Sequence, residues 1–240
     1  MELKGCTALI TGGGRRLGAA CALALGKEGI QVIVHYNRSQ AEAEQICQHI
    51  RANGGKADAI QADLADWSQT AGLIPKIRER FGPFSILLNN ASVFNPGRIA
   101  TTDQALWQEE MAINLNAPFL LIQNFAQQEH VKGKIVNMLD YRVLKPKPGH
   151  LAYTIAKSAL WTLTRLAALE LAPHIQVNAI GPGAILPTSQ SDPGELARIA
   201  AATPMAVPGK PQDIIEALLF FLKQDYITGE LLCIDGGAHL

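Results

Sequence analysis

The chain has 240 residues, of which 48% are hydrophobic and 18% are charged. This composition is typical of a globular protein and excludes a disordered one. Lys plus Arg and Asp plus Glu both number 21, so the formal net charge is zero. A neutral chain gives no reason to expect a nucleic acid or an acidic membrane as a partner.

The four cysteines, Cys6, Cys21, Cys47 and Cys233, are widely spaced and include no CxxC pair. We therefore expect no metal site and no disulfide framework, and we interpret the cysteines as small buried side chains. The N-terminus lacks the pattern of a signal peptide, and no apolar run has the length of a membrane span. A cytoplasmic protein is the expectation.

Short apolar runs alternate with amphipathic segments along the chain. Strands are predicted at 6–10, 31–35, 56–61, 85–89, 133–138, 175–180 and 231–234. Helices are predicted at 16–28, 39–53, 66–81, about 102–130, 152–171 and 211–224.

Several residues mark where these helices begin, end or bend. Gly29, the Gly54–Gly55 pair and Pro173 are expected to end helices, and Ser39 is a plausible N-cap. Pro75 is expected to kink or break its helix.

The alternation of strands and helices predicts an α/β fold. We expect a single Rossmann-like, doubly wound domain over residues 1–240, with a seven-stranded parallel sheet flanked by helices on both faces. Residues 181–211 are irregular and rich in Pro and Gly, which favours a substrate loop.

A glycine-rich turn follows the first strand and opens the first helix, with the sequence TGGGRRLG at 11–18. Glycines allow backbone amides to approach a pyrophosphate, and the helix N-terminus favours its negative charge. Gly12, Arg15, Arg16 and Leu17 are therefore predicted to bind a dinucleotide.

The end of the second strand distinguishes NAD from NADP. A carboxylate there would bind the ribose 2′-hydroxyl, but this chain has Tyr36, Asn37, Arg38 and Ser39. A guanidinium and a hydroxyl suit a 2′-phosphate, so NADP(H) is the predicted cofactor.

A YxxxK pattern opens the predicted helix at 152–171. Tyr153 and Lys157 are four residues apart, so they share one helix face. The ammonium group favours the phenolate and is expected to lower the tyrosine pKa from its usual value of about 10. Tyr153 would then be a proton donor.

Together, the TGxxx(x)xG loop and the YxxxK helix resemble the short-chain dehydrogenase/reductase family, over nearly the whole chain. The resemblance implies that Asn114 is a catalytic residue whose carbonyl holds a water beside Lys157. It also implies cofactor contacts by a further group of residues, namely Asp63, Leu64, Asn90, Ala91, Ser92, Met138, Tyr153, Lys157, Pro182 and Gly183. For Asp63, a helix cap is the alternative.

Asp140 stands where most members of that family have Ser. This departure, the Arg16-Leu17-Gly18 loop ending and the HYxRS segment at 35–39 resemble the pteridine reductases and dihydromonapterin reductases. The NNASxF segment at 89–94 and the terminal DGGAHL resemble them too. The resemblance implies Asp140, Tyr153 and Lys157 as the catalytic set. It also implies substrate contacts by Arg16, Ser92, Phe94, Asp140 and Tyr153, with Phe94 stacked on a pterin.

The predicted function is thus the NADPH-dependent reduction of a C=N bond in a dihydropterin or dihydrofolate. Asp140 would accept a hydrogen bond from the pterin amino group or, if protonated, donate one. A carbonyl or 3-oxoacyl reductase is the alternative, and a non-catalytic NADP(H) sensor is a third reading. Residues 141–150 and 184–194 differ from the pteridine reductases, so the identity of the pterin or folate stays open. Family members are commonly homotetramers.

Overall fold

Seven parallel strands form one sheet in the order β3-β2-β1-β4-β5-β6-β7. The computed structural model describes residues 2–128, 132–187 and 194–240. The strands are β1 (Thr7–Ile10), β2 (Gln31–Tyr36), β3 (Ala57–Gln61), β4 (Ile86–Asn89), β5 (Gly133–Met138), β6 (Ile175–Pro182) and β7 (Leu231–Ile234). Every neighbouring pair is parallel, which confirms the predicted fold class.

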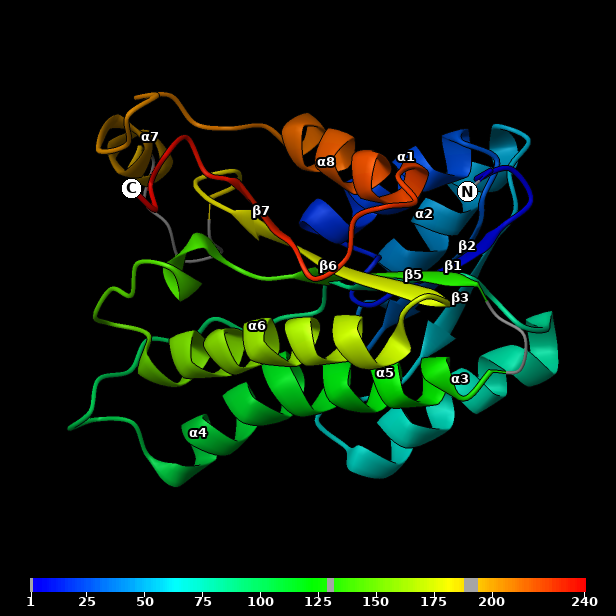
Figure 1. Ribbon diagram of the computed structural model, residues 1–240, viewed down its shortest axis with the longest axis horizontal. Coiled ribbons are helices and arrows are strands. Elements are labelled where there is room, and N and C mark those ends of the chain that lie inside the picture. The colour runs from blue at the N-terminus through cyan, green and yellow to red at the C-terminus, as the bar shows by residue number, and fades with distance from the viewer. Residues whose placement is uncertain (1, 129–131, 188–193) are drawn as a thin grey trace.

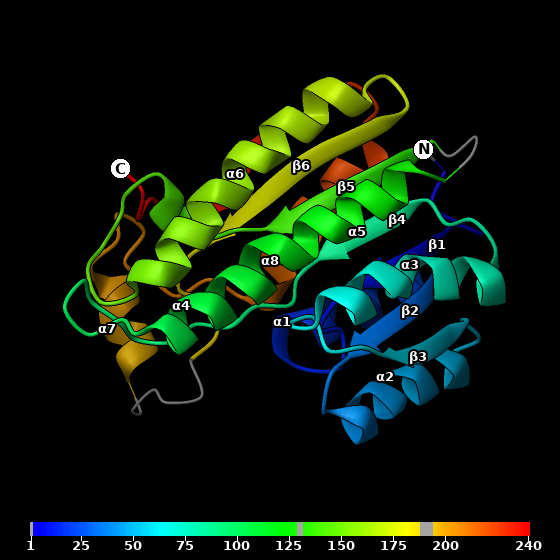
Figure 2. The same ribbon diagram turned by 90° about the horizontal axis from the view of Figure 1, so that it is seen from below.

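Helices cover both faces of this sheet (Figure 1). They are α1 (Arg16–Lys27), α2 (Gln40–Ala52), α3 (Trp67–Phe81), α4 (Gln104–Met111), η1 (Ala112–Asn116), α5 (Ala117–Ala126), η2 (Tyr141–Val143), α6 (Leu151–Leu171), α7 (Glu195–Ala201) and α8 (Pro211–Lys223). Figures 1 and 2 show α1, α2 and α8 on one face and α3, α4, α5 and α6 on the other.

The two faces of the sheet hold separate hydrophobic cores. Neighbouring residues of a strand point to opposite faces, so Leu9 packs under α3 and α5 while Ile10 packs under α1 and α8. Leu87 and Leu88 divide in the same way. Because both faces are covered, the central strands β1 and β4 have continuous apolar runs at Ala8–Ile10 and Ile86–Leu88.

The strand order reverses between β1 and β4. The chain runs outward from β1 to β2 and β3, then returns to place β4 on the other side of β1. In open α/β sheets this switch point leaves a crevice at the carboxyl ends of the strands, where ligands bind. The fold therefore directs attention to the residues that follow β1 and β4.

The predicted helix ends agree with the structure at several glycines and prolines. Gly29 and Gly54 have φ of 79° and 81°, in the left-handed region that glycine tolerates. Pro75 does not break α3, which is continuous from Trp67 to Phe81. Pro75 lies on the exposed face of that helix, where water can bind the carbonyl that it leaves unbonded. Ser39 occupies the N-cap of α2 without a side-chain capping bond.

The predicted helix over about 102–130 is confirmed in part, because helical backbone runs without a break from Gln104 to Ala126 but is not α-helical throughout. Asp103 caps α4 through a hydrogen bond to the amide of Leu106 at 2.8 Å. The helix then widens into the π-helical turn η1 before it continues as α5. Such a turn accommodates an extra residue and is frequent at functional sites. Its predicted end near His130 lies outside the described residues.

The predicted substrate loop at 181–211 is only partly irregular. Strand β6 extends to Pro182, and residues 195–201 form the short helix α7. Residues 188–193 of that loop lie outside the described residues.

Of the four cysteines, Cys21 and Cys47 are buried as predicted, whereas Cys6 and Cys233 are partly exposed; all four are free thiols. Within the described ranges, no helix is both long enough and apolar enough to cross a membrane.

Candidate functional site

The loop between β1 and α1 depends on two glycines. Gly12 has φ of 62°, and a Cβ on Gly18 would lie 2.2 Å from the carbonyl oxygen of Gly12. Only glycine at position 18 allows the first turn of α1 to pack this closely on the loop. The predicted phosphate loop thus has the close backbone approach that a pyrophosphate requires.

The ends of β1 and β4 are joined by a small polar network. The Thr11 hydroxyl accepts the amides of Asn90 and Ala91 at 2.9 and 3.0 Å. The Asn90 side chain donates in return to the carbonyl oxygen of Thr11 at 2.9 Å. These bonds fix both walls of the crevice at the switch point.

His35, at the end of β2, supports the same loop from below. Its Nδ1 accepts the amide of Gly12 at 3.1 Å, and its Nε2 lies 3.0 Å from the carbonyl oxygen of Ala62. This pairing requires the neutral tautomer with a proton on Nε2. Burial lowers the pKa of His35 from 6.5 to about 4, so the ring stays neutral near pH 7.

A cleft of about 580 Å³ opens above these elements. It is lined by thirteen of the eighteen residues that the sequence predicts to bind the dinucleotide, namely Gly12, Arg15, Arg16, Leu17, Tyr36, Asn37, Arg38, Ser39, Asp63, Leu64, Asn90, Ala91 and Ser92. Tyr153 and Lys157, which are also predicted to contact the cofactor, lie outside this lining on α6. Asp63 also accepts the amide of Ala65 at 3.0 Å, so its carboxylate orders the turn after β3.

The predicted cofactor residues Met138, Pro182 and Gly183 lie outside the lining of this cleft, at the carboxyl ends of β5 and β6. A Cβ on Gly183 would lie 2.5 Å from the Cα of Asp235, so this turn packs tightly against the segment after β7.

The three arginines near the cleft differ in their pairing. Arg15 forms an ion pair with Glu42, and Arg16 donates to the carbonyl oxygen of Pro187 at 2.6 Å. Arg38 is exposed, and its guanidinium has no hydrogen bond or ion pair with any described residue. The positive charge that is available to a ligand at the end of β2 is therefore that of Arg38.

Tyr153 and Asp140 are in direct contact. The Tyr153 hydroxyl donates to Oδ2 of Asp140 at 3.0 Å, and Oδ1 of Asp140 accepts the amide of Arg142 at 2.8 Å. Burial, together with the negative charge of Asp140, raises the pKa of Tyr153 well above its usual value. The phenol therefore holds its proton.

Lys157 is buried one helical turn from Tyr153. Its ammonium donates to the carbonyl oxygen of Met138 at 2.8 Å and lies 5.8 Å from the centre of the Tyr153 ring. Burial lowers the pKa of Lys157 to about 8. The expected lowering of the tyrosine pKa is not what the structure shows, because burial and Asp140 raise it.

Asn114 lies in the π-helical turn and is completely buried. Its Oδ1 accepts the Ser92 hydroxyl at 2.6 Å, and its Nδ2 donates to Val93 O at 3.1 Å and to Glu110 Oε2 at 2.6 Å. The side-chain carbonyl is thus already bonded within the protein. Asn114 thus ties the segment after β4 to α4.

Phe94 packs among aromatic and cationic side chains. Its ring is stacked on His150 with centroids 3.7 Å apart and meets Tyr153 edge-on at 4.6 Å. The guanidinium carbon of Arg142 lies 4.9 Å from the ring centre. Phe94 therefore lies beside Tyr153, but its ring already has a stacking partner in His150.

Three residues of this region, Glu110, Arg142 and His150, escaped the sequence analysis, and His35 was named only as part of the HYxRS segment. The spacing of two of them could have pointed to the site. Glu110 lies about one helical turn before Asn114, and His150 lies about one turn before Tyr153. Arg142 has no such spacing. Its Nε and Nη1 are buried without a hydrogen-bond partner among the described residues.

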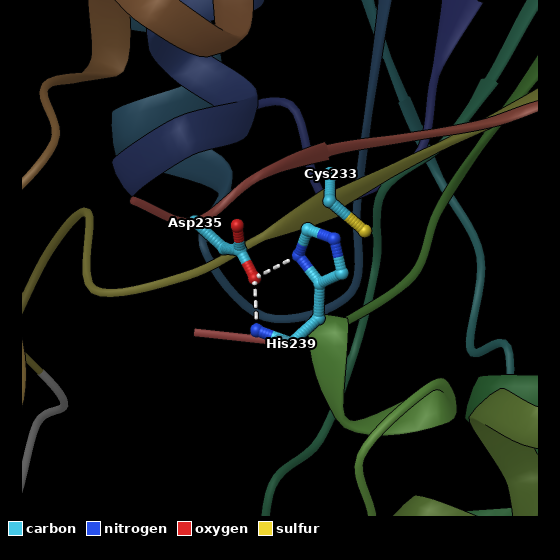
Figure 3. Close-up of side chains that lie close together, drawn as sticks. All are labelled: Cys233, Asp235 and His239. Carbon is cyan, nitrogen blue, oxygen red and sulfur yellow. Dashed lines mark hydrogen bonds and ion pairs between the residues drawn. The ribbon is translucent and has the colours of Figure 1, made fainter. Parts of the chain in front are cut away.

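Cys233, Asp235 and His239 bring possible metal ligands within 4.8 Å of one another (Figure 3). Asp235, however, already accepts the amides of Gly237 and His239 and the Nδ1 of His239 at 2.9 Å. Burial raises the pKa of the Cys233 thiol to about 11. The hydrogen bonds of Asp235 therefore hold the C-terminal turn in place, which explains why these three side chains lie together.

Comparisons with known proteins agree with this geometry. The pattern of the "short chain dehydrogenase" family matches residues 6–195. Glucose 1-dehydrogenase 2 of Bacillus subtilis is 30% identical, with 100% of this chain and 96% of that protein aligned. The crystal structure of FolM alternative dihydrofolate reductase 1 from Brucella canis, complexed with NADP, is 36% identical, with a TM-score of 0.95 over 99% of this chain and 95% of that one. A blue fluorescent protein from a metagenomic library, solved with NADPH, is 31% identical, with a TM-score of 0.92 over 99% of both chains. With the glycine loop, the buried Tyr153–Lys157 helix and these matches, the chain belongs to the short-chain dehydrogenase family.

Proposed function

We propose that this oxidoreductase uses NADPH to reduce a dihydropterin or dihydrofolate. The observation that carries the proposal is the hydrogen bond between Tyr153 and Asp140, at a position where most family members have Ser. A carboxylate has two acceptor oxygens, which can bind the amino and ring N–H groups of a pterin together. A serine hydroxyl has only one oxygen for this purpose. Similarity to a dihydrofolate reductase over the whole chain supports the same substrate class.

The cleft fits NADP(H). Its glycine loop leaves room for a pyrophosphate, and Arg38 presents an unpaired guanidinium where a 2′-phosphate would lie. Among the residues that line the cleft at the end of β2, none is acidic, so nothing there favours a free 2′-hydroxyl. The NADP and NADPH complexes of the similar structures support this cofactor.

The bound cofactor supplies a hydride for the carbon of a C=N bond, and the neighbouring nitrogen then needs a proton. Tyr153 holds a proton at its hydroxyl, directed at Oδ2 of Asp140. A substrate that enters between the two would accept this proton and bond to the carboxyl. Lys157 holds positive charge beside the phenol and stabilises the phenolate that forms.

The experiment that tests the proposal is a steady-state assay of NADPH oxidation. The panel consists of dihydrobiopterin, dihydromonapterin, dihydrofolate and one 3-oxoacyl substrate. We expect turnover of at least one dihydropterin or of dihydrofolate, reduced about 100-fold or more in Asp140→Ala. Turnover of the 3-oxoacyl substrate alone would contradict the pterin assignment and leave the NADP(H) assignment intact.

A carbonyl or 3-oxoacyl reductase is the second candidate. It is favoured by the contact of Phe94 with His150, because a ring that is already stacked need not bind a pterin. The similarity to a glucose dehydrogenase supports it as well. In that case Tyr153 would donate its proton to a carbonyl oxygen instead of a ring nitrogen.

We also propose that the protein is a homotetramer. Several large apolar side chains are exposed on α4, α5 and α6, namely Trp107, Phe119, Ile155, Leu166 and Leu169. These helices lie side by side on one face of the sheet (Figure 2). Sedimentation velocity tests this, and a monomer at micromolar concentration would contradict it.

A further inference from the structure

Glu110 is a charged side chain that is completely buried at the edge of the catalytic site. It is the penultimate residue of α4, one turn before Asn114. The reaction outlined above gives it no role. A buried carboxyl group without a function is costly, because the loss of water opposes its charge and indeed raises its pKa.

The hydrogen bonds of Glu110 define its protonation state. Oε1 accepts the backbone amide of Asn95 at 2.7 Å, and Oε2 accepts Nδ2 of Asn114 at 2.6 Å. The orientation of the Asn114 amide is fixed, because the same Nδ2 donates to the carbonyl oxygen of Val93. Both carboxyl oxygens therefore face N–H donors. Two N–H donors, one on each oxygen, favour the ionised carboxylate over the protonated acid.

These bonds reach the residues that border the substrate. Glu110 holds the amide of Asn95, and the carbonyl oxygen of Asn95 lies 3.0 Å from Nδ1 of His150. Through Asn114, Glu110 is also linked to Ser92. The segment 92–95, which carries Phe94, is thus held at both ends.

The charge of Glu110 acts on the catalytic pair. It raises the pKa of Lys157, as Asp140 does more strongly, and it also raises the pKa of Tyr153. The other charged group that acts on Glu110 is Glu109, its neighbour on α4. Among the described residues that influence Glu110, Lys157 is the only cation. The two buried groups are therefore opposite charges of one site.

We propose that Glu110 is a positioning residue of the active site, which holds residues 92–95 and Asn114 in place and brings a negative charge on α4 against α6, the helix that carries Lys157. The inference rests on the role of Tyr153 and Lys157 in the proposed reduction, but not on the identity of the substrate.

The test compares Glu110→Gln with the wild type in the pH dependence of kcat/KM at saturating NADPH, using whichever substrate the wild type reduces. Glutamine has one acceptor oxygen for two donors and has no charge. Since Lys157 must be protonated, loss of the charge moves the alkaline limb to lower pH, by about one unit. Loss of one bond to the 92–95 segment raises KM about 10-fold. The control is Glu216→Gln, the same change on the exposed face of α8. We expect it to leave the alkaline limb and the KM unchanged.

Glu110→Asp separates the two roles, because it keeps the charge and shortens the side chain. We expect a raised KM and an alkaline limb at the wild-type pH. Two results would overturn the proposal. One is an alkaline limb of Glu110→Asp that moves to lower pH, and the other is a Glu110→Gln profile in which kcat/KM is lower at every pH but both limbs stay at the wild-type pH. Should Glu110→Gln fail to fold, Glu110→Asp alone decides the question. A wild type that reduces only ketones would refute the pterin assignment and leave this comparison valid.

Discussion

The hydroxyl of Tyr153 and the carboxylate of Asp140 form a hydrogen bond of 3.0 Å inside the candidate active site. The same carboxylate starts the short helix η2 by accepting the amide of Arg142. Asp140 thus holds the tyrosine on one side and the start of η2 on the other. Its negative charge also opposes ionisation of the phenol, which keeps Tyr153 protonated at physiological pH.

Replacement of Tyr153 by Phe tests whether this phenol is the proton donor. We expect Tyr153→Phe to lower kcat by about 100-fold or more, because general acid catalysis contributes that much. The NADPH dissociation constant, measured by fluorescence titration, should change less than about 3-fold, because the fold and the cleft are kept. Wild-type turnover in Tyr153→Phe would remove the residue from the mechanism.

Arg38 is expected to select NADPH over NADH. Its guanidinium is exposed at the mouth of the cleft and has no partner among the described residues. Arg38→Ala should therefore weaken NADPH binding by about 10- to 100-fold, the range for a charge-assisted bond, and NADH binding by less than about 3-fold.

Arg80→Ala is the matched control, because Arg80 is an exposed arginine that is paired with Asp58 and does not line the cleft. We expect it to weaken NADPH binding by no more than about 3-fold. Equal losses of NADPH and NADH affinity in Arg38→Ala would place the 2′-phosphate elsewhere.

The fold and the cofactor cleft are the parts that sequence reasoning predicted best. The strands are short apolar runs, and Gly12, Arg38 and Asp63 follow three of them directly, so their convergence at one edge follows from a parallel sheet. The π-helical turn at 112–116 could not be foreseen, because it differs from an α-helix by one inserted residue that leaves the apolar pattern nearly unchanged.

The details of the catalytic centre were also beyond the sequence, since they depend on burial and orientation. The pKa of Tyr153 rises instead of falling because the phenol is buried away from water and its hydroxyl is hydrogen-bonded to the negatively charged Asp140. Likewise, the stacking of His150 on Phe94 joins residues on two separate segments, and no spacing rule connects them.

Gly18 is expected to tolerate no side chain. A Cβ at this position would lie 2.2 Å from Gly12 O and 2.6 Å from the side-chain nitrogen of Asn90. Gly18→Ala should lower the free energy of unfolding by more than about 2 kcal/mol and abolish NADPH binding, measured by urea denaturation and titration. Gly72→Ala is the control, since its Cβ would face open space in α3. There we expect a gain of about 0.5–1 kcal/mol. A stable, NADPH-binding Gly18→Ala protein would show that the loop can open.

His35 is expected to make stability depend on pH below neutrality. In the folded protein its pKa is about 4, against 6.5 when it is exposed. The unfolded chain therefore binds a proton between these values while the folded protein does not, so stability is complete above pH 6.5 and falls as the pH drops towards 4. The loss amounts to about 3 kcal/mol at most.

Urea denaturation of the wild type and of His35→Gln at several pH values between 4.5 and 7.5 measures this contribution. His35→Gln should be less stable at pH 7, by about 1–3 kcal/mol, because glutamine cannot serve both Gly12 and Ala62 with the same geometry. Its stability should vary less with pH, because the titrating ring is gone. His49→Gln, on the exposed face of α2, should retain the wild-type slope. If His35→Gln keeps that slope as well, the acid sensitivity originates in other groups, and the neutral tautomer that holds the phosphate loop is not its cause.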